Sequence, residues 1–270
     1  MHRQYLHVEG RTTAYFDTAP GRADLPVAAL IHGFPLDASM WEAQLRHPPP
    51  GWRLIAPDLR GFGGSTDVEA SAPSIDDYAD DVVDVLRALD IPGAVVAGLS
   101  MGGYVTFAIL RRAPALVRAI VLADTRAGAD SPEAREGRRA MLALLDREGP
   151  AGVATQLLPR LLSEHTRQTR PDVESGVRRL TKQQSAQAIR GALVRLMTRP
   201  DATSELAGCA VPALVIVGEH DAITPVDEAR RLAGGLPDAE LAVIPHAGHM
   251  ANIEQPDAFS SALAAFLARL

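Results

Sequence analysis

The sequence predicts a doubly wound α/β fold, in which helices cover both faces of a mostly parallel sheet. Three observations lead to this prediction. Short runs of Val, Ile, Leu and Ala lack polar alternation, which is typical of strands buried on both faces. Segments with helical spacing of apolar residues separate these runs. This alternation stops once, between about residues 128 and 203, and then resumes.

The predicted strands and helices alternate along the chain, so right-handed crossovers place helices on both faces of the sheet. The first predicted helix, Ile75–Leu89, has its apolar residues on one stripe, and the chain ends on the amphipathic segment Asp257–Leu270. The predicted strands are Val27–Ile31, Leu54–Ala56, Ala94–Ala97, Ala119–Leu122, Ala213–Val217 and Leu241–Ile244.

The interruption indicates an inserted helical cap. From about Gly128 to Asp201 there is no run typical of a buried strand, and Gly149, Pro150 and Pro171 separate the helical stretches. We therefore expect residues 1–127 and 204–270 to form one α/β core, with residues 128–203 as the cap. The helical stretches are Ala134–Asp146, Gly152–Leu162 and Gln184–Met197.

Composition limits the function classes. The chain has 270 residues, 47% hydrophobic and 22% charged, with a formal net charge of −6, which argues against a nucleic-acid or anionic-membrane partner. The one cysteine, Cys209, excludes an internal disulfide and is expected to pack as a small apolar residue. With no paired Cys or clustered His pattern, we expect no metal and no organic cofactor. The terminal helix is compatible with a monomer and with a dimer.

The start of the chain bears on its location. Met1–Gly10 lacks an apolar run after basic residues, so no signal peptide is predicted. No segment approaches the roughly 18 uninterrupted apolar residues of a membrane span. We therefore expect a cytoplasmic protein without a membrane partner.

A G-x-S-x-G sequence, Gly98–Gly102, lies directly after a predicted strand and before a predicted helix. A sharp turn there places Ser100 in a strained conformation with its hydroxyl exposed, because glycine leaves room where side chains would collide. The free N–H groups at the start of the helix favour a developing oxyanion. These features indicate a nucleophile. Alternatively, Ser100 is an ordinary helix N-cap.

A second loop, His32–Pro35, follows the strand Val27–Ile31. A tetrahedral intermediate needs two hydrogen-bond donors, and the backbone amides of Phe34 and Met101 are the predicted pair. The alternative is that this loop is only a strand exit, and His32 itself is expected to be structural. Trp41 is a candidate for the border of the acyl pocket, although a large aromatic residue is more often part of the core.

A serine hydroxyl needs a base within hydrogen-bond reach, and the base needs an acid that orients it. His249 is the candidate base because it lies in a Gly-containing loop after the strand that ends at residue 244, and His246 is its rival. Asp221 is the candidate acid because it follows the strand Ala213–Val217. Asp124 is an alternative acid, and Asp221 is also interpretable as a solvated turn carboxylate.

These residues carry a resemblance to the α/β-hydrolase superfamily over nearly the whole chain. The Ser, Asp, His order is also that family's order. The resemblance implies an eight-stranded sheet, an oxyanion hole from the Phe34 and Met101 amides, and a cap over the pocket. The matching segments are His32–Pro35, Gly98–Gly103, Gly218–Asp221 with Pro225, and Ala247–Met250 running into Asn252–Pro256.

Within the superfamily, the chain looks most like small esterases, 3-oxoadipate enol-lactonase-like proteins and cofactor-free haloperoxidases. Dehalogenases and epoxide hydrolases of this fold have an aspartate where this chain has Ser100. The predicted function is therefore hydrolysis of a small carboxylic ester or lactone through an acyl-enzyme. Perhydrolysis by the same three residues and a slow-turnover ligand receptor are the alternatives.

Overall fold

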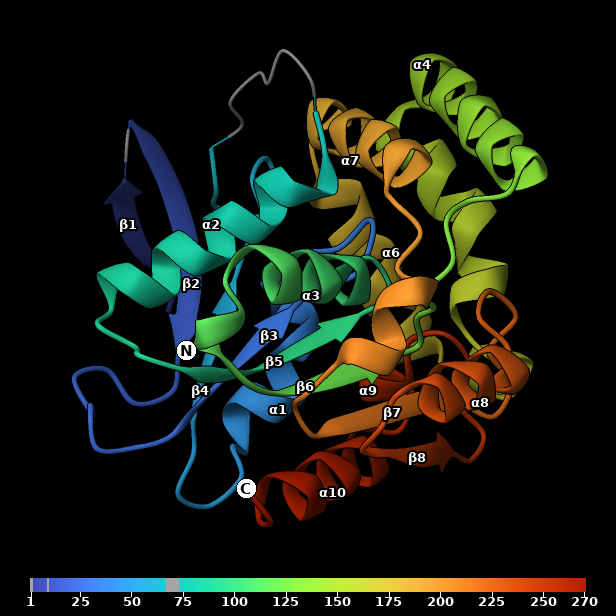
Figure 1. Cartoon of the computed structure of the whole chain (residues 1–270). Coiled ribbons are helices and arrows are strands. Elements are labelled where there is room, and N and C mark those ends of the chain that lie inside the picture. The colour runs from blue at the N-terminus through green and yellow to red at the C-terminus, as the bar shows by residue number, and fades with distance from the viewer. Residues whose placement is uncertain (1, 9, 67–72) are drawn as a thin grey trace.

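A computed structural model of the chain describes residues 2–8, 10–66 and 73–270. Its eight strands form one sheet in the order β1-β2-β4-β3-β5-β6-β7-β8 (Figure 1). The strands are β1 (Gln4–Val8), β2 (Arg11–Asp17), β3 (Val27–Ile31), β4 (Arg53–Pro57), β5 (Ala94–Leu99), β6 (Val117–Ala123), β7 (Ala213–Gly218) and β8 (Ala239–Ile244). The helices are α1 (Glu42–Arg46), α2 (Ile75–Ala88), α3 (Met101–Arg112), α4 (Pro132–Leu161), α5 (Glu164–Thr169), α6 (Pro171–Gln183), α7 (Ala186–Thr198), α8 (Val226–Gly235), α9 (Ala251–Glu254) and α10 (Pro256–Leu267).

The six strands from β3 to β8 are parallel to one another, and all six were predicted, five from buried apolar runs and β8 as the segment Leu241–Ile244 before the His249 loop. The mostly parallel eight-stranded sheet is therefore confirmed. The two remaining strands, β1 and β2, are antiparallel and were not predicted as strands. In β1 the side chains alternate between exposed and half-buried, so this strand has no continuous apolar run to identify it.

Helices cover both faces of the sheet, with α2 and α3 on one face and α1 and α10 on the other (Figure 1). The central strands β3, β5 and β7 are buried along their whole length, so the core lies on both sides of them. Because parallel strands end at the same edge, the segments after β3, β5, β6, β7 and β8 meet there. This edge holds the sequence-predicted site residues.

Four helices, α4 to α7, lie between β6 and β7 in the chain and include the predicted helical stretches. Helix α4 is kinked at Gly149, whose φ of 64° is outside the helical range. Helix α6 was not predicted, because charged and polar residues make up most of its sequence. In the described part of the chain, no helix is long and apolar enough to cross a bilayer.

The two ends of this helical segment are bound to each other. Asp130 accepts a hydrogen bond from Arg199 at 2.6 Å, and both side chains are almost fully buried. Arg199 also donates to the carbonyl oxygen of Gly128 at 2.9 Å, and the amide of Ala202 donates to the carbonyl oxygen of Ala127 at 3.0 Å. These contacts fix the point where the helical segment leaves the sheet and returns to it.

The Asp130 carboxylate should contribute stability that depends on pH. Burial opposes its charge, but the guanidinium groups of Arg138 and Arg199 outweigh burial and lower its pKa. Asp130→Asn removes the carboxylate that faces buried Arg199, so the free energy of unfolding should fall by about 3 kcal/mol at pH 7. Because the folded-state pKa is the lower one, this contribution is complete above about pH 4 and disappears at lower pH.

Urea unfolding of both proteins at pH 7 and pH 3 measures this difference. The gap between their unfolding free energies should be large at pH 7 and much smaller at pH 3. An Asp130→Asn variant that unfolds at the wild-type urea concentration at pH 7 would contradict the role given to this ion pair.

Candidate active site

The turn between β5 and α3 holds Ser100 in a strained backbone conformation, with φ 54° and ψ −110°. Its amide donates to the carbonyl oxygen of Ala123 at 2.8 Å. Its carbonyl oxygen accepts from the amide of Gly103 at 2.9 Å and from the hydroxyl of Thr125 at 2.8 Å. Ser100 occupies the N-cap position of α3, but its side chain makes no helix-capping hydrogen bond, so it is not an ordinary N-cap. The neighbouring strand and helix hold the strained residue in place.

Glycine is required on both sides of Ser100. A Cβ at Gly98 would lie 2.1 Å from the carbonyl oxygen of Gly102, and a Cβ at Gly102 would lie 2.3 Å from the carbonyl oxygen of Ile31. Both contacts are with backbone atoms, which cannot rotate away. The turn therefore packs directly against β3 and the loop that follows it.

Ser100 and His249 are in hydrogen-bond contact, and so are His249 and Asp221. The Ser100 Oγ lies 2.8 Å from His249 Nε2, and His249 Nδ1 lies 2.8 Å from Asp221 Oδ2. Since a carboxylate only accepts, Nδ1 carries the proton and Nε2 is free to accept one from the hydroxyl. His249 and Asp221 are buried, whereas Ser100 is partly exposed. The arrangement can transfer a proton from a hydroxyl that solvent or a ligand can reach.

Asp221 is held by the turn that follows β7. Its Oδ1 accepts from the amides of Ile223 at 2.7 Å and Thr224 at 2.9 Å, and its Oδ2 accepts from the Thr224 hydroxyl at 2.6 Å. Burial opposes the charge, but His249 and the bonds from Thr224 outweigh it and lower the pKa of Asp221. The carboxylate is therefore ionised and points at the imidazole, which argues against a solvated turn residue.

The alternative acid, Asp124, has a different role. Its Oδ1 accepts from the amide of Gly218 at 2.8 Å, and it makes no hydrogen bond to His249 among the described residues. Burial, and then the charge of Asp221, raise the pKa of Asp124 well above its usual range. Of two neighbouring buried carboxyls, the surroundings thus favour the charge on Asp221 and oppose it on Asp124.

The rival base, His246, lies at the surface away from this hydrogen-bond chain. Its ring packs against that of His165, with 5.3 Å between the centroids, and its amide donates to Glu219 at 3.0 Å. Glu219, His220 and His246 have possible metal-ligand atoms within 4.8 Å of one another, all on exposed side chains. This surface group has no contact with Ser100 in the described structure, and no role is assigned to it.

His32 is structural, as predicted. Its Nε2 accepts from the amide of Leu59 at 3.0 Å and its Nδ1 donates to the carbonyl oxygen of Gly33 at 3.1 Å. Its ring packs edge-on against Phe62. Burial is the main cause that lowers its pKa to about 4, so His32 is neutral at pH 7. Both ring nitrogens are occupied, which leaves none to act on a substrate.

The amides of Phe34 and Met101 are available as hydrogen-bond donors. Neither donates to another group in the ranges that the structure describes. The two segments that carry them are adjacent, because a Cβ at Gly33 would lie 3.5 Å from the Cβ of Ser100. Two free amides beside the hydroxyl fit the requirement for an oxyanion site, so the predicted pair stays the candidate.

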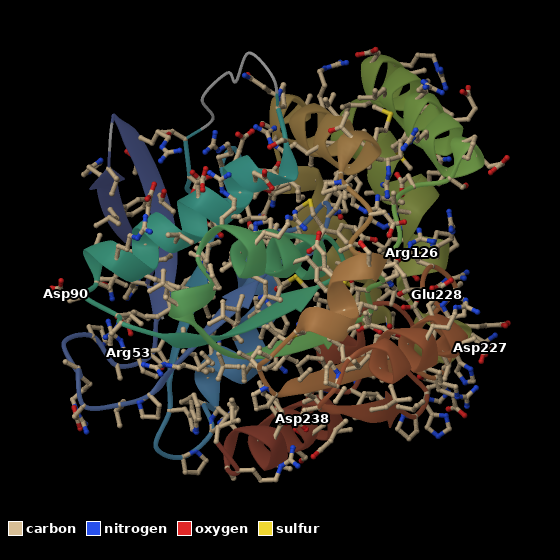
Figure 2. The ribbon with its side chains drawn as sticks, in the orientation of Figure 1. Arg53, Asp90, Arg126, Asp227, Glu228 and Asp238 are labelled. Carbon is tan, nitrogen blue, oxygen red and sulfur yellow. The ribbon has the colours of Figure 1, made fainter. Side chains whose placement is uncertain are left out.

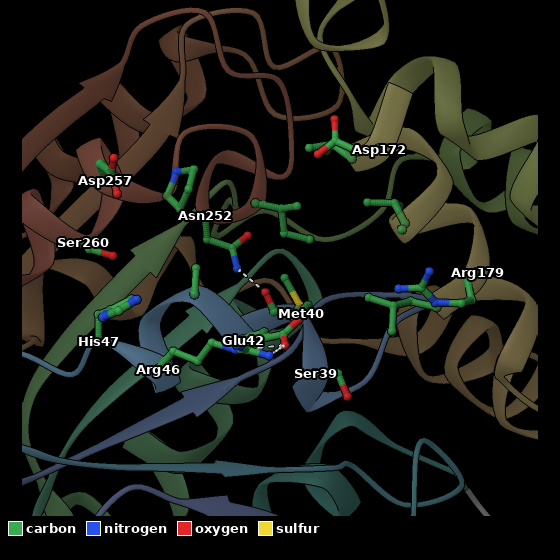
Figure 3. A pocket seen from close by; sticks show the side chains of 17 residues that line it. Ser39, Met40, Glu42, Arg46, His47, Asp172, Arg179, Asn252, Asp257 and Ser260 are labelled. Atoms are coloured by element: carbon green, nitrogen blue, oxygen red, sulfur yellow. Dashed lines mark hydrogen bonds and ion pairs between the residues drawn. The ribbon is translucent and has the colours of Figure 1, made fainter. Parts of the chain in front are cut away.

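A hollow of about 600 Å³ opens between α1, α6 and the α9–α10 region (Figure 3). Its lining includes Met40 and Asn252, but not Ser100, His249 or Asp221. Trp41 is not among the lining residues either. It is 1% exposed and packs against Phe259, with 5.8 Å between the ring centroids. The placement of Trp41 at the acyl pocket therefore stays a prediction, and the structure assigns this side chain to the core.

Two contacts of the site were not anticipated. Thr224 was not singled out, although its place three residues after Asp221 in a turn is typical of a side chain that hydrogen-bonds an Asp. Glu254 lies in the segment Asn252–Pro256, which was singled out only for its resemblance to the superfamily. Its carboxylate accepts a hydrogen bond from the amide of Gly248 in the His249 loop. Nothing in a single sequence indicates which loop a buried carboxylate faces.

Residues 29–256 match the family model for the alpha/beta hydrolase fold. The chain belongs to this family. Over 258 residues the chain is 33% identical to a protein of Variovorax paradoxus named "Putative carbamate hydrolase RutD", covering 93% of this chain and 94% of the relative. The superfamily predicted from the four sequence segments is confirmed.

Two solved structures are similar over almost the full length. A thermophilic esterase from Thermogutta terrifontis matches this chain with a TM-score of 0.92 and 36% identity, covering 100% of this chain and 99% of the esterase. The enol-lactonase from Burkholderia xenovorans LB400 matches with a TM-score of 0.90 and 28% identity, covering 98% of this chain and 100% of the lactonase. The family thus includes esterase and lactonase relatives of this chain.

The packing at Gly98 predicts a large effect of one methyl group. Gly98→Ala should lower the free energy of unfolding by about 2–3 kcal/mol, because the new Cβ overlaps a backbone oxygen. Gly137→Ala, in an exposed turn of α4 with nothing within 4 Å, should instead stabilise by about 0.5–1 kcal/mol. Urea unfolding of both variants measures the contrast. Equal stability of Gly98→Ala and wild type would show that the turn has more room than described.

Proposed function

We propose that this α/β-hydrolase cleaves a small carboxylic ester or lactone with Ser100 as nucleophile, His249 as base and Asp221 as the residue that orients the base. The observation that carries the proposal is the chain of two 2.8 Å contacts from a partly exposed hydroxyl to a buried, ionised carboxylate. A strained serine with a hydrogen-bonded imidazole is the arrangement that acyl transfer requires.

In the acylation step, Ser100 Oγ bonds to the acyl carbon while its proton moves to His249 Nε2. The former carbonyl oxygen becomes an oxyanion, to which the Phe34 and Met101 amides donate. The carbon–oxygen bond to the leaving group then breaks, and the imidazolium returns the proton to the departing alkoxide. In a lactone this alkoxide stays attached to the acyl group.

Water completes the cycle. It attacks the acyl-serine ester, gives a proton to His249, and forms a second tetrahedral intermediate that the same two amides stabilise. Collapse of this intermediate returns the proton to Ser100 Oγ and releases the carboxylic acid. Asp221 holds the imidazole in one tautomer and stabilises it when it is charged in both halves of the cycle.

Residues 128–203 are proposed to act as a cap that shapes the acyl pocket over the core formed by residues 1–127 and 204–270. The buried contacts at the root of this segment support this division, since they gather its two ends at one point. Basic and acidic side chains are mixed along the cap helices, which favours no particular substrate charge.

The relatives support the choice of ester and lactone substrates. The esterase and the enol-lactonase named above are similar over nearly the whole chain and have TM-scores of at least 0.90. A carbamate carries the same acyl carbon with a nitrogen in place of one neighbouring atom, so it belongs in the same substrate panel.

Ser100→Ala should abolish hydrolysis without unfolding the chain. Removal of the nucleophile is expected to lower kcat by on the order of 10⁴-fold or more, because a bound water is a poor substitute for the oriented hydroxyl. The assay is hydrolysis of p-nitrophenyl esters of increasing acyl length, a set of lactones and an aryl carbamate. Ser204→Ala, at an exposed serine of the turn Thr203–Gly208, is the matched control and should keep full activity.

Each outcome of this assay has a distinct meaning. Rapid cleavage that only Ser100→Ala abolishes supports the proposal and identifies the substrate class. Equal activity of Ser100→Ala and wild type would overturn it. If no substrate turns over but ligands protect α4 to α7 from hydrogen exchange, a ligand receptor replaces the enzyme. Peracid formation in added peroxide that outpaces hydrolysis would replace the hydrolase with a perhydrolase.

A further inference from the structure

Glu254, the last residue of α9, carries a carboxylate that is 1% exposed and faces backbone amides. Its Oε1 accepts from the amide of Gly248 at 2.8 Å and from that of Met250 at 3.3 Å. Its Oε2 accepts from the amide of Ser163 at 2.8 Å. Three amide donors thus share one buried carboxylate, which satisfies all three in a region that water does not reach.

The first two amides belong to the residues on either side of His249. The Glu254 carboxylate therefore fixes the two residues that adjoin the imidazole-bearing residue, and with them the position of its Cα. The side chain itself has contacts at both ring nitrogens, to Asp221 and Ser100. The ring contacts orient the imidazole, while Glu254 restrains the backbone from which it projects.

The third amide belongs to a different part of the fold. Ser163 lies between the end of α4 and the start of α5, within the helical segment inserted after β6. A Cβ at Gly248 would lie 2.5 Å from the Ser163 nitrogen, so the two backbones are in direct contact. The Ser163 hydroxyl also donates to the carbonyl oxygen of His246 at 2.9 Å. The α4–α5 junction and the His249 loop thus pack as one unit around Glu254.

We propose that Glu254 is a positioning residue that sets the location of His249 and couples it to the α4–α5 junction of the cap. The inference rests on the proposed function, in which His249 is the base. A shift of the junction moves the Ser163 amide, and through the shared carboxylate it moves the residues beside the base.

The chemistry of this contact makes it sensitive to an isosteric change. Glutamine has the same size as glutamate, but its amide offers one acceptor oxygen and one NH₂ donor. If the oxygen faces Gly248 and Met250, the NH₂ group opposes the Ser163 N–H. If it faces Ser163, the loop of His249 loses both of its acceptors. In either orientation at least one buried amide is left without a partner.

The test compares Glu254→Gln with Asp17→Asn. Asp17 is also a buried carboxylate, but it pairs with Arg53 at 2.7 Å. Arg53, labelled in Figure 2, is the first residue of β4, at the end of the strand away from the site. Both variants should lose stability. Only Glu254→Gln should lower kcat, by about 10- to 100-fold, because a displacement of about 1 Å at a reacting group has effects of this size. Its KM should stay within about threefold of wild type, since the change affects proton transfer and not binding.

Hydrogen exchange supplies a readout that does not depend on activity. In Glu254→Gln the Ser163 amide should exchange about tenfold faster, and so should the amide of Gly248 or of Met250 in the His249 loop. In Asp17→Asn all three amides should exchange as in wild type.

The outcomes separate this inference from the proposed function. If Ser100→Ala abolishes turnover but Glu254→Gln has the kcat of Asp17→Asn, the positioning role is wrong and the proposed function stands. If Glu254→Gln speeds exchange only at Ser163, or only in the His249 loop, the coupling is wrong. If Ser100→Ala stays active, the proposed function itself fails, and concerted exchange at both sites would then support only a structural link.

Discussion

The turn from β5 into α3 leaves no room for a side chain at Gly98 or Gly102, and the rest of the site is arranged around that tight packing. The close approach of Gly102 to Ile31 brings the end of β3, and with it the Phe34 amide, beside the turn. The bond from the Ser100 amide to Ala123 ties the turn to β6. The Ser100 hydroxyl is partly exposed, and three neighbouring backbone segments hold the residue in its strained conformation. The reactive group is therefore presented by rigid elements and not by a flexible one.

Burial and hydrogen-bond partners determine which side chains at the carboxyl edge of the sheet are charged. The Asp221 carboxylate, which contacts His249, has a lowered pKa, whereas the pKa of its buried neighbour Asp124 is raised. Burial keeps His32 neutral, and burial together with the charge of Asp221 opposes ionisation of Asp124. The carboxylate that faces the imidazole of His249 is that of Asp221. A second ionised carboxylate at Asp124 would repel the charge on Asp221.

Much of this arrangement was predictable from sequence, because parallel strands place their carboxyl ends at one edge. Runs of apolar residues predicted the strands, the G-x-S-x-G sequence after one strand indicated Ser100 as the candidate nucleophile, and the place of Asp221 after another indicated it as the candidate acid. Strand β1 was missed because its side chains alternate between exposed and half-buried, and β2 because only its second half, Ala14–Asp17, is buried.

The burial of Trp41 against Phe259 and the bonds of Glu254 to Ser163 join segments far apart in the chain. Such contacts depend on how the helical segment packs against the core. The spacing of apolar residues in one sequence predicts helices and strands, but not which distant segments contact each other. The same holds for the hollow beside α6, which three separate parts of the chain line together.

Covalent trapping of the nucleophile tests the central claim most directly. A p-nitrophenyl alkylphosphonate reacts with an activated serine to give an ester that water releases slowly, and peptide mass spectrometry then locates it. Trypsin yields the peptide Ala88–Arg111, in which Ser100 is the sole serine. The account predicts loss of hydrolysis in step with one phosphonyl group on this peptide at Ser100. Inactivation with the group on another residue, or full activity with no modified peptide, would contradict it.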